Sequence, residues 1–204
     1  MYTVTNCYNQ VFDQPKKWQR RVTLPSFEGT TLLTVSSTAE HKNLKIMIPV
    51  SEYLEQHYPG FQFRFVLTCR AEALNVPEHL MHHFVFVEKV DVSECPNLYA
   101  QADIMFMPTL LECFSATYPE AMRMEVPIVT TDLEFAHGIC GDAACYYSAV
   151  NPQAAAEAIY KVVTDKSYAR QLAYEGERQL QKFDNYEQRA EKLVGILEEI
   201  ASSN

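Results

Sequence analysis

Hydrophobic residues occur in short runs that alternate with segments of helical periodicity, and this alternation begins at Thr30. Apolar runs of about four to eight residues are typical of strands that are buried on both faces. We expect strands over 30–37, 62–67, 84–87, 104–107, 127–129 and 145–147.

Helical patterns fill most of the segments between these runs. Residues 42–56 have an apolar helix face, and Pro49 should bend this helix or move its start to a later residue. Pro96 and Pro152 suit the first turns of two further helices. The other expected helices are a short one that carries Glu120, then 133–141, 167–183 and 186–201, with 71–83 helical or irregular.

Strands that alternate with helices predict a parallel sheet with right-handed crossovers. We expect an α/β fold, Rossmann-like, with about five or six parallel strands, flanking helices and a helical C-terminus. Residues 30–183 should form this domain and 184–204 a C-terminal helix, and the final helices should pack elsewhere than on the sheet. Residues 1–29 are polar and irregular, and we interpret them as a linker from an N-terminal domain that is missing here. The basic cluster around Trp18 is interpreted as solvated.

Composition narrows the class of protein. The chain has 204 residues, 48% of them hydrophobic, and contains no run of about 18 apolar residues and no signal-peptide pattern, so we expect a cytoplasmic protein. A net charge of −9 argues against nucleic acid as a partner but allows one small phosphorylated ligand. The six cysteines form no CxxC pair, which favours reduced thiols and no zinc site.

Two acids flank the loop after the predicted strand 104–107. Glu120 fits a capping box with Thr117, in which it would only satisfy backbone N–H groups. Glu112 has no such local role, so its carboxylate is free to accept hydrogen bonds from ligand hydroxyls. The amides of residues 113–117 can hold an anion at the start of the following helix. A sugar nucleotide requires both kinds of group side by side: a carboxylate that binds the sugar hydroxyls, and backbone amides that bind the phosphates.

Three other features of the sequence bear on function. Lys42 follows the first strand, where an anion nearby or simple solvation would both explain it, and Asn43 or Ser37 could cap the local turn. His82 and His83 lack acidic ligands at metal spacing, so we interpret them as surface or core-edge histidines. Neither a Gly-rich phosphate loop nor a GxSxG nucleophile motif occurs.

The segment 108–130 resembles the C-terminal domain of the retaining GT-B glycosyltransferases of the "group 1" family. The family pattern is P-S-x-x-E-G-F-G-x-x-x-x-E-A-M-A-x-G-x-P-V-V, and the chain has Glu112, seven residues, then Glu120. The likeness extends from Asn6 through VSSTAEHKN at 35–43, which aligns with V-G-R-x-x-x-x-K-G. It continues through 84–86, 98–103 and 135–144, and covers roughly residues 4–200.

The resemblance implies a role for each matching residue. Glu112 would bind the donor sugar hydroxyls at the catalytic centre and Glu120 the ribose. Lys42 would neutralise the diphosphate, with Ser37 at a position where the family usually has Arg. Backbone groups of the loop would contact the diphosphate and sugar; these are Phe114, Ser115, Ala116 and Thr117.

The resemblance also implies a reaction. A UDP- or GDP-sugar would donate a hexose-type sugar to a glycan or lipid-linked acceptor with retention of configuration, without a metal or other cofactor, as in polysaccharide biosynthesis. The acceptor side would belong to an N-terminal domain of the same polypeptide, so this donor-binding half should be inactive alone. The full-length protein would be cytoplasmic or peripheral at the inner face of the membrane.

Departures from the family pattern leave alternatives open. Glycines of the pattern are replaced by Cys113, Ser115 and Glu125, which leaves less space for a ligand on the loop backbone. The alternatives are a GT-B sugar-nucleotide epimerase and a non-catalytic interaction domain with a degenerate donor site. The sequence does not identify the base, the sugar, the acceptor or the oligomeric state.

Overall fold

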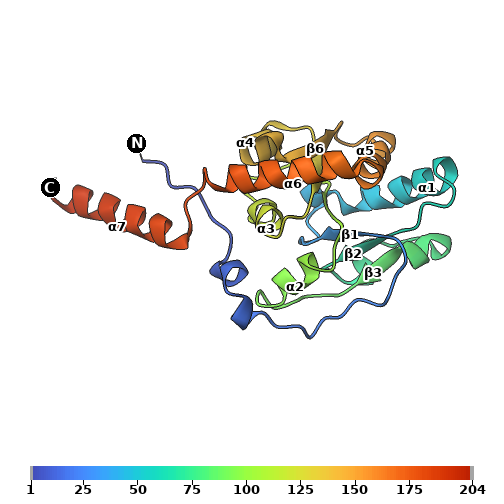
Figure 1. Ribbon diagram of the computed structural model, residues 1–204, viewed down its shortest axis with the longest axis horizontal. Coiled ribbons are helices and arrows are strands. Elements are labelled where there is room, and N and C mark those ends of the chain that lie inside the picture. Colours follow the sequence, from blue (N-terminus) through green and yellow to red (C-terminus); the bar gives the residue numbers. More distant parts are fainter. Residues whose placement is uncertain (1, 203–204) are drawn as a thin grey trace.

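Six parallel strands form one sheet in the computed structural model, which describes residues 2–202 (Figure 1). The strand order is β3-β2-β1-β4-β5-β6. Strands β2 and β3 are added on one side of β1, and β4, β5 and β6 on the other, so the strand order reverses between β1 and β4. This is the doubly wound Rossmann-like arrangement that the sequence predicts. The strands are β1 Thr30–Thr34, β2 Phe63–Leu67, β3 Phe84–Phe86, β4 Ile104–Met107, β5 Ile128–Thr131 and β6 Ala144–Tyr147.

Helices connect successive strands. They are α1 Met47–His57, α2 Cys95–Tyr99, α3 Thr117–Arg123, α4 Glu134–Cys140, α5 Pro152–Thr164, α6 Lys166–Leu180 and α7 Tyr186–Ser202.

The predicted start of the first helix at residue 42 was wrong, because the 3₁₀ turns η3 (Glu40–Lys42) and η4 (Leu44–Ile46) precede α1. Pro49 therefore lies in the first turn of α1, where backbone N–H groups have no helical partner, so the later start is the alternative that holds. Neither turn has a side-chain cap from Asn43 or Ser37.

Alternate strand residues fill two cores. Leu32 and Phe65 belong to the core that α1 and α5 cover, whereas Leu33, Val66 and Met105 belong to the core that α2, α3 and α4 cover. Figure 1 shows these helices on the two faces of the sheet. Every strand except β3 and β6 is buried along its whole length, so these runs do not alternate between apolar and polar positions, and the polar residues within them are mostly threonines.

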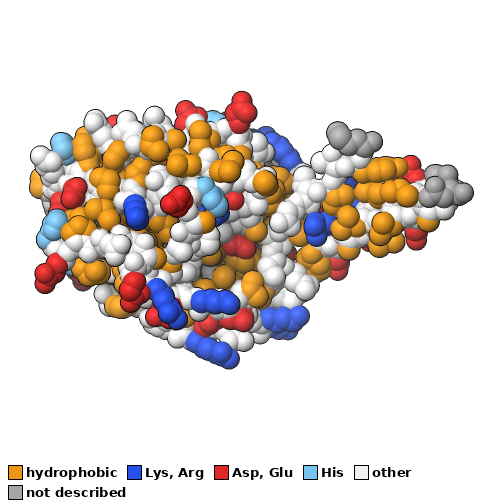
Figure 2. Space-filling view, turned by 180° about the vertical axis from the view of Figure 1, so that it is seen from behind, with side chains coloured by type: hydrophobic (Ala, Val, Ile, Leu, Met, Phe, Trp, Pro, Cys, Tyr) orange, Lys and Arg blue, Asp and Glu red, His pale blue; other side chains and the backbone are white. Residues whose placement is uncertain are grey.

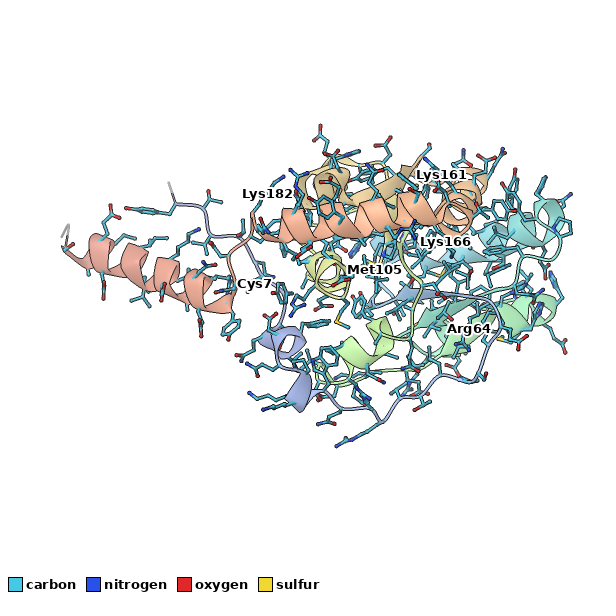
Figure 3. All side chains as sticks on the ribbon, viewed as in Figure 1. Cys7, Arg64, Met105, Lys161, Lys166 and Lys182 are labelled. Carbon is cyan, nitrogen blue, oxygen red and sulfur yellow. The ribbon has the colours of Figure 1, made fainter. Side chains whose placement is uncertain are left out.

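The N-terminal segment packs on the second of these faces. Val11 and Phe12 are buried in that core, and the Trp18 indole N–H donates to Val11 O at 2.7 Å. Arg64, labelled in Figure 3, donates from β2 to Pro25 O at 2.7 Å. Residues 11–25 thus pack on the domain, although the basic residues around Trp18 are exposed as expected.

The C-terminal helix α7 projects away from the rest of the molecule, and none of its described residues is buried (Figure 1). Apolar side chains gather on it (Figure 2), and the exposed ones are Leu193, Val194, Leu197 and Ile200. The expectation that the final helices leave the sheet holds for α7 but was wrong for α6, which packs against α3 and η7 (Gly141–Ala143). Across residues 2–202, the helices are too short or too polar to cross a bilayer.

Glu125 occupies a position where the related pattern has glycine. Its φ is 56°, in the left-handed region, and this backbone conformation explains why the pattern has glycine there. A side chain in the left-handed region costs about 1–2 kcal/mol relative to glycine's freedom. We expect Glu125→Gly to raise the free energy of unfolding by about 1 kcal/mol in urea denaturation. The matched control is Gly60→Ala, at φ +90° with open space around its Cβ, which should lower it by a similar amount. A loss of stability in Glu125→Gly would contradict this explanation.

Candidate functional site

The loops that follow β1 and β4 meet where the strand order reverses. The Leu110 N–H donates to His41 O at 2.7 Å, and the Thr109 hydroxyl donates to the same oxygen at 3.2 Å. These two bonds hold the β4 loop against turn η3. The crevice outside the carboxyl ends of β1 and β4 is where open α/β sheets bind ligands.

Lys42 and Glu112 form an ion pair across this junction. Lys42 Nζ contacts Glu112 Oε1, and the two side chains are only 14% and 11% exposed. The Thr109 hydroxyl approaches the same carboxylate oxygen at 3.4 Å. The expectation that the Glu112 carboxylate is free of structural partners was therefore wrong, because a lysine 70 residues earlier balances its charge. The pair places a cation and an acceptor of hydroxyl hydrogen bonds side by side.

The loop between Glu112 and α3 carries the next predicted residues. The Ser115 and Thr117 hydroxyls share a hydrogen bond of 2.8 Å, and Phe114 packs edge-on against Phe183. The amides of residues 113–116 donate to no group in the described part of the chain, so they are available to a ligand. Cys113 and Ser115 replace glycines without a positive φ, so the substitutions here cost no left-handed strain.

Glu120 has a different environment from the one predicted. Helix α3 begins at Thr117 without a side-chain cap, so the capping box was wrong. Its carboxylate turns inward instead and accepts a hydrogen bond from the Tyr99 hydroxyl at 3.1 Å. Burial raises the pKa of Glu120 to about 7, and the Tyr99 hydrogen bond only partly offsets this. Sequence reasoning missed Tyr99, whose only signal was an aromatic residue at a buried position of α2.

Two hollows lie beside these groups. A cleft of about 690 Å³ is bounded by residues after β1, β2 and β3, among them Ser37, Arg70 and Lys89. A second hollow of about 420 Å³ contains Glu120 and Ala116 together with the N-terminal segment 7–10. Arg70 was missed by sequence reasoning, and it brings a guanidinium to the cleft where Ser37 replaces the arginine of the related pattern.

The predicted site residues thus fall into neighbouring groups. Lys42 and Glu112 are in contact, Ser115 is bonded to Thr117, and Ala116 shares a hollow with Glu120. Ser37 lines the larger cleft separately from them. All of these groups follow the carboxyl ends of strands or begin α3. The fold defines a domain of the doubly wound α/β class.

Comparison with known proteins gives the family. The model of the "Glycosyl transferases group 1" family matches residues 29–165. The chain belongs to this family of glycosyltransferases, and its fold is that of a GT-B half-domain. No curated protein sequence matches the chain significantly.

Several solved structures share this fold. Sucrose-phosphate synthase from Thermosynechococcus elongatus superposes with a TM-score of 0.74 at 19% identity, over 98% of this chain and 52% of that one. A glycosyltransferase from Rickettsia africae gives 0.75 at 16% identity, over 98% of this chain and 57% of its own. An α,α-trehalose 6-phosphate synthase from Burkholderia multivorans gives 0.70 at 11%, over 86% and 44%. The chain therefore spans about half the length of these structures.

Proposed function

We propose that this chain is the donor-binding half of a retaining glycosyltransferase that uses a UDP- or GDP-sugar. The observation that carries the proposal is the largely buried Lys42–Glu112 ion pair at the point where the strand order reverses. A nucleotide sugar has sugar hydroxyls directly beside a diphosphate. An acid and a cation in contact match this arrangement, since the acid can bind the sugar hydroxyls and the cation can bind the diphosphate.

The remaining contacts follow from the same placement. Lys42 and the amides of residues 113–116 would hold the diphosphate, and Glu112 would accept hydrogen bonds from the hydroxyls of the hexose-type sugar. Glu120 would bind the ribose hydroxyls. Charge that develops on the departing nucleoside diphosphate is then stabilised by Lys42 and the amides, without a metal in this reaction.

The base would enter the cleft of about 690 Å³, because that cleft reaches the loop after β3. Base recognition in such folds relies on backbone groups near residues 86–91, and Glu88 and Lys89 line the cleft. The cation that Ser37 does not supply would come from Arg70 on the neighbouring loop.

The acceptor would be bound by a second domain. The matched structures are about twice as long as this chain, and the reaction in a GT-B enzyme occurs between two domains. We propose that an N-terminal domain of the same polypeptide supplies the glycan or lipid-linked acceptor site, and that the enzyme works in the cytoplasm, free or at the inner face of the membrane. A GT-B epimerase would use the same donor site and differ in the acid and base groups that the two domains contribute.

Turnover by the isolated chain tests this division of roles. Incubated with UDP- and GDP-sugars, residues 1–204 should neither transfer, hydrolyse nor epimerise the sugar, because the second wall of the active site is absent. Proton NMR of the anomeric signals over hours is the measurement, with Glu112→Gln as the matched control. Turnover above that control would show that these residues suffice, and would contradict the proposal.

A further inference from the structure

A cluster of metal-ligating side chains lies far from the donor site, at the start of the edge strand β3. Glu55 on α1 and His82 and His83 in the 3₁₀ turn η6 (Glu78–His83) place one ligand atom each within 4.8 Å of one another. Oε1 of Glu55 lies 2.8 Å from Nε2 of His83 and 3.4 Å from Nε2 of His82. The histidine doublet was predicted to have no acidic partner, which was wrong because α1 brings Glu55 to it.

The contacts of His83 place two hydrogen-bond acceptors against each other. Its Nδ1 lies 3.0 Å from Phe63 O, and its ring stacks on the Phe63 ring at 4.0 Å with the side chain only 8% exposed. A carbonyl oxygen only accepts, so Nδ1 must carry the hydrogen. In the neutral ring Nε2 then presents a lone pair to the Glu55 carboxylate, which is also an acceptor. Either a second proton or a metal ion must lie between the two atoms.

The same arrangement orients histidines that bind metals. An imidazole that ligates through Nε2 commonly donates its Nδ1–H to a backbone carbonyl, which fixes the ring and raises its basicity. Tetrahedral zinc holds nitrogen and oxygen ligands about 3.3 Å apart when each bond is about 2.0 Å. The observed separations of 2.8 and 3.4 Å bracket that value. The exposed side chains of His82 and Glu55 leave the outer side open to water as a fourth ligand.

We propose that Glu55, His82 and His83 form a binding site for a divalent metal of the zinc type. The site lies at the amino ends of β2 and β3, because Phe63 begins β2 and His83 directly precedes β3. The donor groups follow the carboxyl ends, so this metal takes no part in the glycosyl transfer proposed above. Its effect is to join α1 to the edge strand through η6, and the inference stands independently of the donor site.

Calorimetric titration of the chelator-treated chain with ZnCl₂ tests the site. We expect one equivalent to bind, and the melting temperature to rise by roughly 5–10 °C at a hundredfold excess over Kd. His82→Ala is the main variant, because His82 is exposed and its loss leaves the core unchanged. It and Glu55→Gln should each weaken binding by about tenfold or more.

Two matched controls separate this site from other zinc ligands on the chain. His79→Ala alters a histidine of the same turn outside the cluster, and Cys113→Ser removes the exposed thiol; neither should change the affinity. Absorption of the Co²⁺ form should show tetrahedral bands without thiolate charge transfer. Absence of stoichiometric binding, or binding that His82→Ala and Glu55→Gln leave unchanged, would overturn the proposal and leave a proton-bridged His83–Glu55 pair.

Discussion

Glu120→Gln is expected to stabilise the chain by about 3 kcal/mol at pH 8 while weakening the binding of a nucleotide sugar. The folded protein keeps the Glu120 proton up to a pKa of about 7, whereas the unfolded chain loses it near 4.5. Stability therefore falls as pH rises from 4.5 to 7, and the loss is complete above 7. At about 1.4 kcal/mol for each pH unit, the neutral amide should recover about 3 kcal/mol.

Urea denaturation at pH 8 and pH 4.5 measures this gain, which should vanish at the lower pH. Gln still offers an oxygen to the Tyr99 hydroxyl, so the internal hydrogen bond is retained. Affinity should fall by about tenfold or more, because ribose hydroxyls lose a charged acceptor. For the same reason, the affinity of the unmodified chain should fall as pH is lowered through 7. A variant that is destabilised at pH 8, or that binds donor as well as the unmodified chain, would contradict the role assigned to Glu120.

Lys42→Met is expected to lower both stability and donor affinity. It leaves the Glu112 carboxylate without a cation at a position where that side chain is 11% exposed. Removal of one partner of a largely buried pair costs about 2 kcal/mol or more, which urea denaturation detects. Donor affinity should fall by about tenfold to a hundredfold, because a charge-assisted contact to the diphosphate is lost.

A double variant separates the two effects. Lys42→Met with Glu112→Gln should recover most of the stability, since no unpaired charge remains, but none of the affinity. Arg178→Met is the matched control, because its pair with Glu175 lies on the surface of α6 and is worth only about 0.5 kcal/mol or less. Full affinity in Lys42→Met would contradict the assignment of Lys42 to the diphosphate.

The fold could be predicted from the sequence because each strand is a short, mainly apolar or threonine-containing run between polar loops. Burial on both faces produces such runs, and parallel topology follows from the helices between them. The start of α1 could not be placed, because η3 and η4 are single turns whose periodicity resembles that of the helix that follows. The packing of Phe12 on the sheet also escaped prediction, since an isolated buried aromatic has no periodic neighbours.

The sequence proposes the site residues one by one but does not predict which of them contact each other. Glu112 and Lys42 were identified singly, yet their contact joins residues 70 apart in sequence. Thr117-x-x-Glu120 has the pattern of a capping box, but the buried Tyr99 hydroxyl offers Glu120 a different partner. The Glu55–His83 contact is likewise set by how α1 packs against η6. Long-range partners of this kind depend on packing, which local sequence patterns do not encode.

Calorimetric titration with UDP- and GDP-sugars at pH 8 tests the central claim most directly. We expect one site with a Kd of about 1 mM or below, unchanged by the exposed control Glu134→Gln and weakened by about tenfold in Glu112→Gln. The free nucleoside diphosphate should lose less affinity in Glu112→Gln, because that carboxylate faces the sugar. No binding at about millimolar nucleotide sugar, or equal binding by Glu112→Gln and the unmodified chain, would contradict the account and favour an interaction domain that has lost its donor site.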